Sequence, residues 1–238
     1  MLTLMIIRTA EKIENCVPDC RKESMISSRS MDDIIKKVKN HNKAIAYAFF
    51  GEIRELDFCE IVWKTEDRAL LFFGRNQKVL YVNGDASRES GYQKYLAWFN
   101  QNINYRNRNY IKNSLLYDGY GFVEYMEDFT WTQEKCNSEC YQKYGELIAI
   151  VWSLSGRPVM PESVGLKDGM PVIKDILPLL DRKIDYRELP EADRISEWLR
   201  DQFMDLEVID RIEQGYTVQK EFIENNRTDI ETLIRLCF

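Results

Sequence analysis

The chain has 238 residues, of which 45% are hydrophobic and 12% aromatic, enough for one large domain or two lobes that share an interface. Its 33 Lys and Arg stand against 39 Asp and Glu, and the net charge of −6 excludes a phosphate-neutralising role and so a nucleic-acid partner. No run reaches the roughly 20 apolar residues that a membrane helix needs, so we expect a cytoplasmic protein with no membrane partner.

The first 29 residues form a separate N-terminal extension. Their start is apolar, but it lacks the basic region of a signal peptide. A helix then opens at Ser30, and its apolar positions continue to Phe50, just before Gly51. The single histidine, His41, falls among asparagines on the polar face of this helix. Chemistry that needs two histidines is therefore excluded by composition alone.

A β-rich region follows the first helix. Residues 52–63 contain one strand, and the runs 69–73 and 78–82 form a hairpin around a short polar turn. Apolar side chains then recur at the spacing of one helix face. They are Tyr92, Tyr95, Leu96, Phe99 and Ile103. A polar loop and a strand over residues 121–127 complete this part of the chain.

The longest predicted helix comes next. Thr130 and Gln133 have the spacing of a capping box, in which each side chain caps a backbone N–H at a helix start. We predict a helix from this point to a stop at Gly156. Cys136 and Cys140 would then share one helix face, because residues four apart lie above one another.

The remaining elements complete an order that is typical of protein kinases. Short strands over 163–167 and 170–174 flank an Asp-Gly turn, and the chain is helical from Pro190 on. The predicted class is α+β, with a kinase-like two-lobed fold. After the extension over residues 1–29, we expect a β-rich N-lobe with a hinge strand over 30–128 and a helical C-lobe over 129–238.

Three segments resemble a known family. Residues 119–154 begin Gly-Tyr-Gly-Phe-Val-Glu-Tyr-Met-Glu and end Tyr-Gly-Glu-Leu-Ile-Ala-Ile-Val-Trp-Ser-Leu. Residues 156–175 close with Pro-Val-Ile-Lys-Asp, and residues 78–100 close with Leu-Ala-Trp-Phe-Asn. In order and spacing these segments resemble the dehydratase domain of class II lanthipeptide synthetases, the LanM type, over residues 30–238. The resemblance implies a bacterial, kinase-like protein of lantibiotic biosynthesis.

Members of that family phosphorylate Ser or Thr of a precursor peptide with ATP and then eliminate the phosphate. The resemblance implies where the catalytic residues would stand, and most of those positions hold other residue types. The phosphate-holding lysine falls on Val82, and the Asp and His of a D-x-H motif fall on Pro158 and Met160. The Asn that serves as a metal ligand falls on Ser163, and an upstream acidic segment retains one carboxylate, Glu60. We therefore predict no catalytic residue and a vestigial kinase-like site.

Two acidic residues survive at their family positions. They are Glu162 and Asp175, the second at the usual metal-binding aspartate. Both could hold Mg²⁺, but one carboxylate rarely suffices, and the alternative is that Asp175 caps a turn while Glu162 is solvated. The family's Arg and Thr elimination motif would lie beyond Phe238. We expect neither a resident metal nor another cofactor.

The cysteines allow a further alternative. Cys16 with Cys20 and Cys136 with Cys140 could form a four-thiolate zinc site. In structural zinc sites, however, the two cysteines of a pair usually have two residues between them and lie on a turn. We therefore favour packed, reduced thiols, which are the default in a reducing cytoplasm.

These observations favour a catalytically degenerate, dehydratase-like pseudoenzyme that binds a peptide or protein. Its expected partner is a precursor peptide or a protein such as a lanthipeptide synthetase. An extended leader peptide could add a strand to the β-rich lobe. The alternative is an enzyme, one part of a split synthetase that carries out ATP-dependent phosphorylation and dehydration. A third possibility is the remnant of a larger gene.

Overall fold

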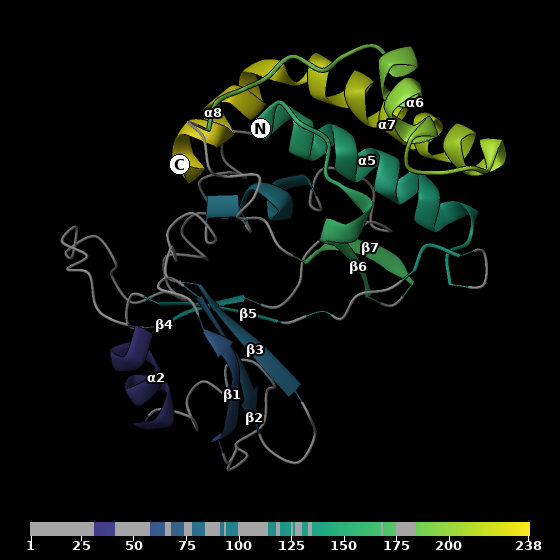
Figure 1. Ribbon diagram of the computed structural model, residues 1–238. Coiled ribbons are helices and arrows are strands. Elements are labelled where there is room, and N and C mark those ends of the chain that lie inside the picture. The colour runs from purple at the N-terminus through teal and green to yellow at the C-terminus, as the bar shows by residue number, and fades with distance from the viewer. Residues whose placement is uncertain are drawn as a thin grey trace.

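The computed structural model describes residues 31–40, 58–64, 68–73, 78–83, 91–92, 94–99, 114–117, 120–124, 126, 130–132, 135–167, 169–174 and 184–238. Within these ranges the protein combines helices with antiparallel sheets, so the predicted α+β class is confirmed. A five-stranded sheet and the main helices form two separate parts, with a small hairpin on the helical side (Figure 1). No helix in the described ranges is long and apolar enough to cross a membrane.

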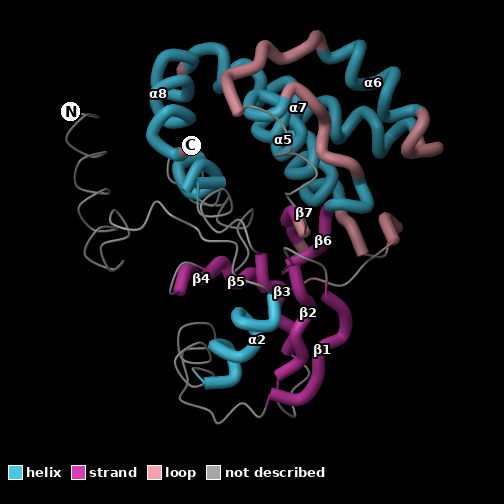
Figure 2. Tube along the Cα trace, turned by 60° about the vertical axis from the view of Figure 1, so that its left-hand side comes forward, coloured by secondary structure: helices cyan, strands magenta, loops and turns pink. Residues whose placement is uncertain are grey.

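Helix α2 (Met31–Asn40) lies beside the five-stranded sheet (Figures 1 and 2). Lys64 of the sheet donates to Asp32 in the first helical turn at 2.8 Å. Both side chains are exposed, so this ion pair adds little stability. The predicted helix start near Ser30 is confirmed. The rest of that predicted helix, with His41, lies outside the described residues.

Five strands form the larger sheet: β1 (Phe58–Lys64), β2 (Arg68–Phe73), β3 (Lys78–Asn83), β4 (Ser114–Tyr117) and β5 (Tyr120–Glu124). Their order is β1-β2-β3-β5-β4, and every neighbouring pair is antiparallel. The predicted hairpin is confirmed as β2 and β3, which pair without a break. β1 pairs with β2 through two register shifts. The sequence analysis predicts no strand at residues 114–117, where the structure has β4.

The helical part consists of α5 (Ser138–Ser155), α6 (Ala192–Arg200), α7 (Leu206–Asn225) and α8 (Arg227–Cys237), with helical residues at 91–92 and 94–99. α5 and α7 cross with their backbones in contact. A Cβ added to Gly145 would overlap the carbonyl oxygen of Ile212, and one added to Gly215 would overlap that of Gln142. Glycine at both positions thus permits this close approach.

Buried side chains from these helices form one core. It includes Tyr92, Tyr95, Leu96, Phe99, Tyr144, Leu147, Ile148, Ile212, Tyr216, Ile223, Ile230 and Ile234. The predicted apolar face is therefore confirmed over residues 92–99, and its last predicted member, Ile103, lies outside the described residues. Two leucines of these helices are exposed, Leu206 at 67% and Leu236 at 70%. Leu206 is the first residue of α7, and Leu236 is the second-last residue of α8.

α5 begins later than the capping-box pattern predicts. Asn137 is its N-cap, and the side-chain oxygen of Asn137 accepts the Cys140 N–H at 2.9 Å. The predicted start at Thr130 is wrong, because residues 130–132 lie outside any helix and Trp131 packs against the core. Cys136 therefore precedes the helix, and only Cys140 lies in its first turn.

A two-stranded hairpin lies between the main helices and the larger sheet (Figure 2). β6 (Val164–Lys167) pairs with β7 (Met170–Ile173). The turn contains Gly169 at φ 77°, a left-handed conformation that glycine adopts without strain. The predicted hairpin is confirmed, with each strand one residue shorter. A single turn of 3₁₀ helix, η2 (Pro161–Ser163), leads directly into it.

Candidate functional site

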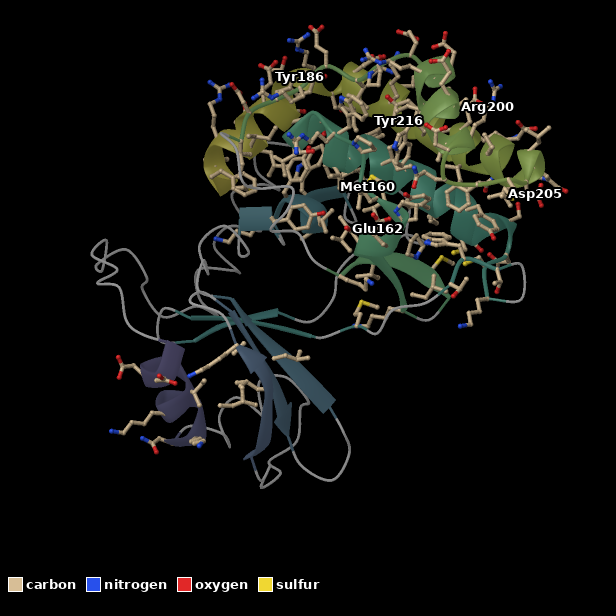
Figure 3. All side chains as sticks on the ribbon, viewed as in Figure 1. Met160, Glu162, Tyr186, Arg200, Asp205 and Tyr216 are labelled. Carbon is tan, nitrogen blue, oxygen red and sulfur yellow. The ribbon has the colours of Figure 1, made fainter. Side chains whose placement is uncertain are left out.

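The chain between α5 and β6, residues 156–163, carries four of the predicted site positions. Gly156 ends α5 in a left-handed conformation, φ 71°, and its N–H donates to the Trp152 carbonyl at 2.7 Å. This sharp end turns the chain back toward the hairpin. Met160 and Glu162 consequently lie close to α5 and the hairpin (Figure 3). We call residues 156–163 the site loop.

Two aromatic side chains hold the site loop through its backbone. The hydroxyl of Tyr144, on α5, donates to the Val159 carbonyl at 2.7 Å. The indole N–H of Trp131 donates to the Pro161 carbonyl at 3.1 Å. The two rings also contact each other, with centroids 4.6 Å apart. Because Val159 is itself fully buried, the loop is fixed at its centre.

The site loop offers little acid–base chemistry. Pro158 and Met160 are half-buried and carry no group that exchanges a proton near neutral pH. Glu162 is exposed, as one of the two sequence interpretations predicts. Burial, and secondarily the charge of Glu162, raises the pKa of Tyr144 well above its ordinary value. The Tyr144 phenol is therefore a permanent hydrogen-bond donor to the loop and not a base.

Ser163 closes the loop onto the hairpin. Its N–H donates to the Met160 carbonyl at 2.9 Å, and its own carbonyl accepts the Lys174 N–H at 2.8 Å. Pro158, Met160, Glu162 and Ser163 thus lie in one short segment, and these bonds join its end to the hairpin. Asp175 lies outside the described residues.

The other two predicted positions lie in the larger sheet. Glu60 is on β1 opposite Phe72, and Val82 is on β3 opposite Ala69 and Phe122. β2 separates the two strands, so Glu60 and Val82 are not direct neighbours across the sheet. The seven predicted positions thus divide between the sheet, the site loop and the chain after the hairpin.

Three cysteines with described side chains, Cys136, Cys140 and Cys237, are free thiols, and Cys59 lies on β1. Within the described part of the chain, no three His, Cys, Asp or Glu residues gather closely enough to hold a metal ion. Cys16 and Cys20 fall outside that part, so the four-thiolate zinc hypothesis stays untested.

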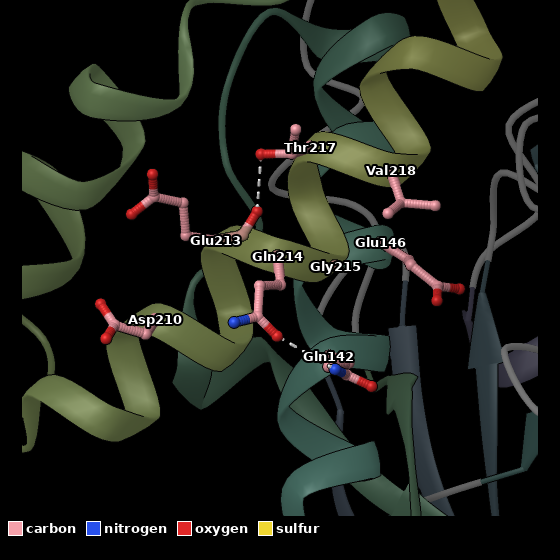
Figure 4. A pocket seen from close by; sticks show the side chains of 8 residues that line it. All are labelled: Gln142, Glu146, Asp210, Glu213, Gln214, Gly215, Thr217 and Val218. Atoms are coloured by element: carbon pink, nitrogen blue, oxygen red, sulfur yellow. Dashed lines mark hydrogen bonds between the residues drawn. The ribbon is translucent and has the colours of Figure 1, made fainter.

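Sequence reasoning missed a second feature, an open groove of about 720 Å³ between α5 and α7 (Figure 4). Its lining residues are Gln142, Glu146, Asp210, Glu213, Gln214, Gly215, Thr217 and Val218. The sequence signal that could have located it is glycine inside two long helices, at Gly145 and Gly215, where the backbones meet.

Most polar groups of this groove bond within the protein. The Gln142 amide donates to the Gln214 side chain at 3.3 Å, and the Thr217 hydroxyl donates to the Glu213 carbonyl at 2.9 Å. Lys143 forms an ion pair with Glu146 at 2.8 Å. The Thr217 hydroxyl thus bonds to its own helix and is not paired with a base.

Comparison with known proteins adds a family. A family model described as a domain of unknown function, DUF4135, matches residues 29–211. That domain is associated with lanthipeptide synthetases. No curated protein matches the chain.

Proposed function

The chain belongs to the DUF4135 family, and from this membership we propose that it is a kinase-like pseudoenzyme related to the class II lanthipeptide dehydratases. It binds a precursor peptide, or a protein such as a lanthipeptide synthetase, and does not transfer phosphate. In this proposal the larger sheet belongs to the N-lobe and the site loop with its hairpin belongs to the C-lobe.

The site loop carries this proposal. At the positions of the family's Asp and His it presents Pro158 and Met160, which can neither accept the hydroxyl proton nor assist elimination. The loop is also fixed by the bonds from Tyr144 and Trp131. A neighbouring acidic group, Glu162, is exposed on the loop, and one carboxylate rarely suffices to hold a metal.

The sheet supports the same conclusion. In protein kinases the phosphate-binding lysine stands on the third strand, and Val82 stands on β3, the third strand among the described residues. Valine supplies no cation there. Kinases also cover the phosphates with a glycine-rich loop, whereas residues 65–67, which join β1 to β2, are Thr-Glu-Asp. ATP would lose charge-assisted contacts worth about 1.5–3 kcal/mol each.

For the partner, we propose strand addition at β4. β4 is an outer strand in the order of the described sheet, and it pairs regularly with β5. β1 is the outer strand at the opposite edge of the described sheet, and its pairing with β2 has two register shifts. Such irregularities discourage pairing with a further strand. An extended peptide would therefore pair its backbone with β4.

ATP binding tests the proposal. The melting temperature of the protein should not change with millimolar ATP and Mg²⁺, and mass spectrometry should find no phosphorylated or dehydrated Ser or Thr in offered precursor peptides. A stabilisation by ATP that Asp175→Ala abolishes would reveal a working nucleotide site. Dehydration of a precursor peptide would establish the alternative, a part of a split synthetase.

A gain-of-function variant tests the kinase-like correspondence separately. Val82→Lys restores the missing cation and should produce ATP-dependent stabilisation. The matched control is Val79→Lys, the same change in the same strand. Side chains alternate between the two faces of a strand, so residues 79 and 82, three positions apart, face opposite sides of the sheet. Equal behaviour of the two variants would contradict the correspondence at position 82.

A further inference from the structure

The outward face of α7 carries exposed apolar side chains at two places along the helix. Met204 and Leu206 lie at its N-terminal end, the first fully exposed and the second 67% exposed. Val218, about three turns further along, is 65% exposed. Leu206, Asp210, Gln214 and Val218 follow one another at four-residue intervals, and residues with this spacing form one ridge on a helix surface.

This ridge borders the open groove between α5 and α7 (Figure 4). On the α5 side the groove is lined by Gln142 and Glu146, which are again four residues apart. Gly215, where the two backbones meet, adds no side chain to the groove. A groove between two such ridges is the shape into which the ridge of a third helix packs.

The groove is acidic. Its described lining contains no Lys or Arg and three carboxylates, which belong to Glu146, Asp210 and Glu213. Lys143 offsets the charge of Glu146 at 2.8 Å, whereas the donor to Glu213 is the uncharged hydroxyl of Ser196. Negative charge therefore remains on α7 at positions 210 and 213, between the two exposed apolar places.

From this pattern we propose that the groove binds a basic, amphipathic helix of a partner protein. Apolar side chains of that helix contact Leu206 and Val218, and its Lys or Arg side chains contact Asp210 and Glu213. Leu206 and Val218 are 12 positions apart, or about 18 Å along the helix axis. The partner helix therefore needs three to four turns, with its apolar face laid in the groove.

The charge and the shape of the groove favour this occupant over others. Nucleic acid, an anionic membrane surface and an acidic segment are all repelled by the carboxylates. An extended strand finds no sheet edge here, because both sides of the groove are helices whose backbone groups bond within the helix. A small polyamine would match the carboxylates but would leave Leu206 and Val218 uncovered.

This inference rests on the proposed function in one respect, because it gives the chemistry of the protein partner. It uses a surface other than β4, which is proposed to hold an extended peptide. The net charge of −6 additionally steers a basic partner toward the protein.

Fluorescence anisotropy of the full-length protein with synthetic peptides tests the groove. The probe is a labelled peptide of about 18 residues, five helical turns, with Leu at positions i, i+4, i+7 and i+11 and Lys beside this face. One control peptide has Glu in place of every Lys, and another has the same composition in scrambled order. The Lys peptide should bind, and its affinity should fall as salt screens the charges. The Glu peptide should not bind, and the scrambled peptide should bind about tenfold more weakly or worse.

Two variants locate the contact. Asp210→Lys reverses a charge in the groove and Val218→Ser removes an apolar contact, and each should weaken binding about fivefold or more. Both side chains are exposed, so the melting temperature should stay close to that of the unchanged protein. Glu197→Lys is the matched control. It makes the same kind of charge change at an exposed position on α6, outside the groove lining, and should leave the affinity unchanged.

Several results would overturn the proposal. They are no binding of the Lys peptide, equal binding of the scrambled peptide, and an equal loss of affinity in Glu197→Lys and Asp210→Lys, which would mean that net charge alone attracts the peptide. None of these results affects the ATP measurements or the pairing at β4. Conversely, ATP turnover would contradict the proposed function and leave the peptide result at the groove unchanged.

Discussion

At the scale of single residues, buried hydroxyl groups tie distant segments of the helical part together. Tyr144 bonds to Val159, and the Tyr216 hydroxyl donates to the Pro190 carbonyl at 2.8 Å. The Tyr95 hydroxyl bonds to Ser153 at 2.7 Å, and Ser153 in turn donates to the Ile150 carbonyl at 2.7 Å. A buried hydroxyl that loses its hydrogen-bond partner destabilises the folded state by its full desolvation free energy.

Ser153→Ala should therefore destabilise the protein by about 1–3 kcal/mol, because it strands the buried Tyr95 hydroxyl. Adding Tyr95→Phe should recover part of this loss, since no orphaned polar group then remains. Urea denaturation of the two single variants and the double variant measures the coupling. Ser155→Ala, in the same helix but half-buried, is the control and should cost less. Strictly additive costs at positions 95 and 153 would contradict the argument.

At the scale of elements, the crossing of α5 and α7 determines the helical part. Gly145 meets the backbone of α7, and Gly215 meets the backbone of α5. A methyl group at either position must push the two helices apart. The core side chains between them would then lose close packing.

Gly145→Ala and Gly215→Ala should each cost about 1–3 kcal/mol through overpacking, even though alanine favours a helix by about 1 kcal/mol over glycine. The double variant should cost less than the sum, since the first change already separates the helices. Thermal and urea denaturation measure these effects. Gly169→Ala is the control. It meets no atom within 4 Å and bears only the strain of its left-handed backbone. A larger loss at Gly169 than at Gly145 would exclude the overpacking explanation.

The elements also show which sequence signals are reliable. The hairpins β2–β3 and β6–β7 and the helix near residues 92–99 were predictable, because turn residues and apolar spacing are local properties. The start of α5 was not predictable, since a Thr-x-x-Gln spacing also occurs where tertiary contacts hold the chain in a non-helical conformation. Trp131 makes such contacts with Tyr144 and Pro161. β4 is only four residues long, and its pairing with β5 depends on the sheet.

The candidate site was predictable only in part. Positions 158, 160, 162 and 163 could be grouped from the sequence because they are close in the chain. The hydrogen bonds by which Tyr144 and Trp131 fix this loop could not be predicted, since a bond from a distant ring to a backbone carbonyl leaves no local sequence pattern. The groove between α5 and α7 was not predictable for the same reason, because it depends on how two helices distant in the sequence cross.

At the scale of the whole molecule, burial makes the protein sensitive to alkali. Burial is the largest cause that raises the pKa of Tyr95, Tyr144 and Tyr216, and it raises the pKa of Tyr141 to about 12 and that of Cys237 to about 11. The folded state therefore retains protons that the unfolded chain releases. The stabilisation is complete below the unfolded pKa values and is lost as pH rises through the folded ones.

We expect the free energy of unfolding to fall from about pH 9 to about pH 12, the window set by Cys237 and Tyr141. Urea denaturation at constant ionic strength measures this fall. Tyrosinate absorbance gives an independent check, because several phenols should ionise only when the protein unfolds. Tyr141→Phe removes one of these groups and should make the decline shallower. Native tyrosines that all ionise near pH 10, the ordinary value, would contradict the assignment.

The site loop also has a consequence for protein engineering. Its course is fixed by Tyr144 and Trp131 through the carbonyls of Val159 and Pro161, not through the side chains at positions 158 and 160. New side chains at these two positions would therefore join a backbone that is already ordered and need not organise it. The loop is thus a ready framework on which an acid and a histidine can be introduced without rebuilding the fold.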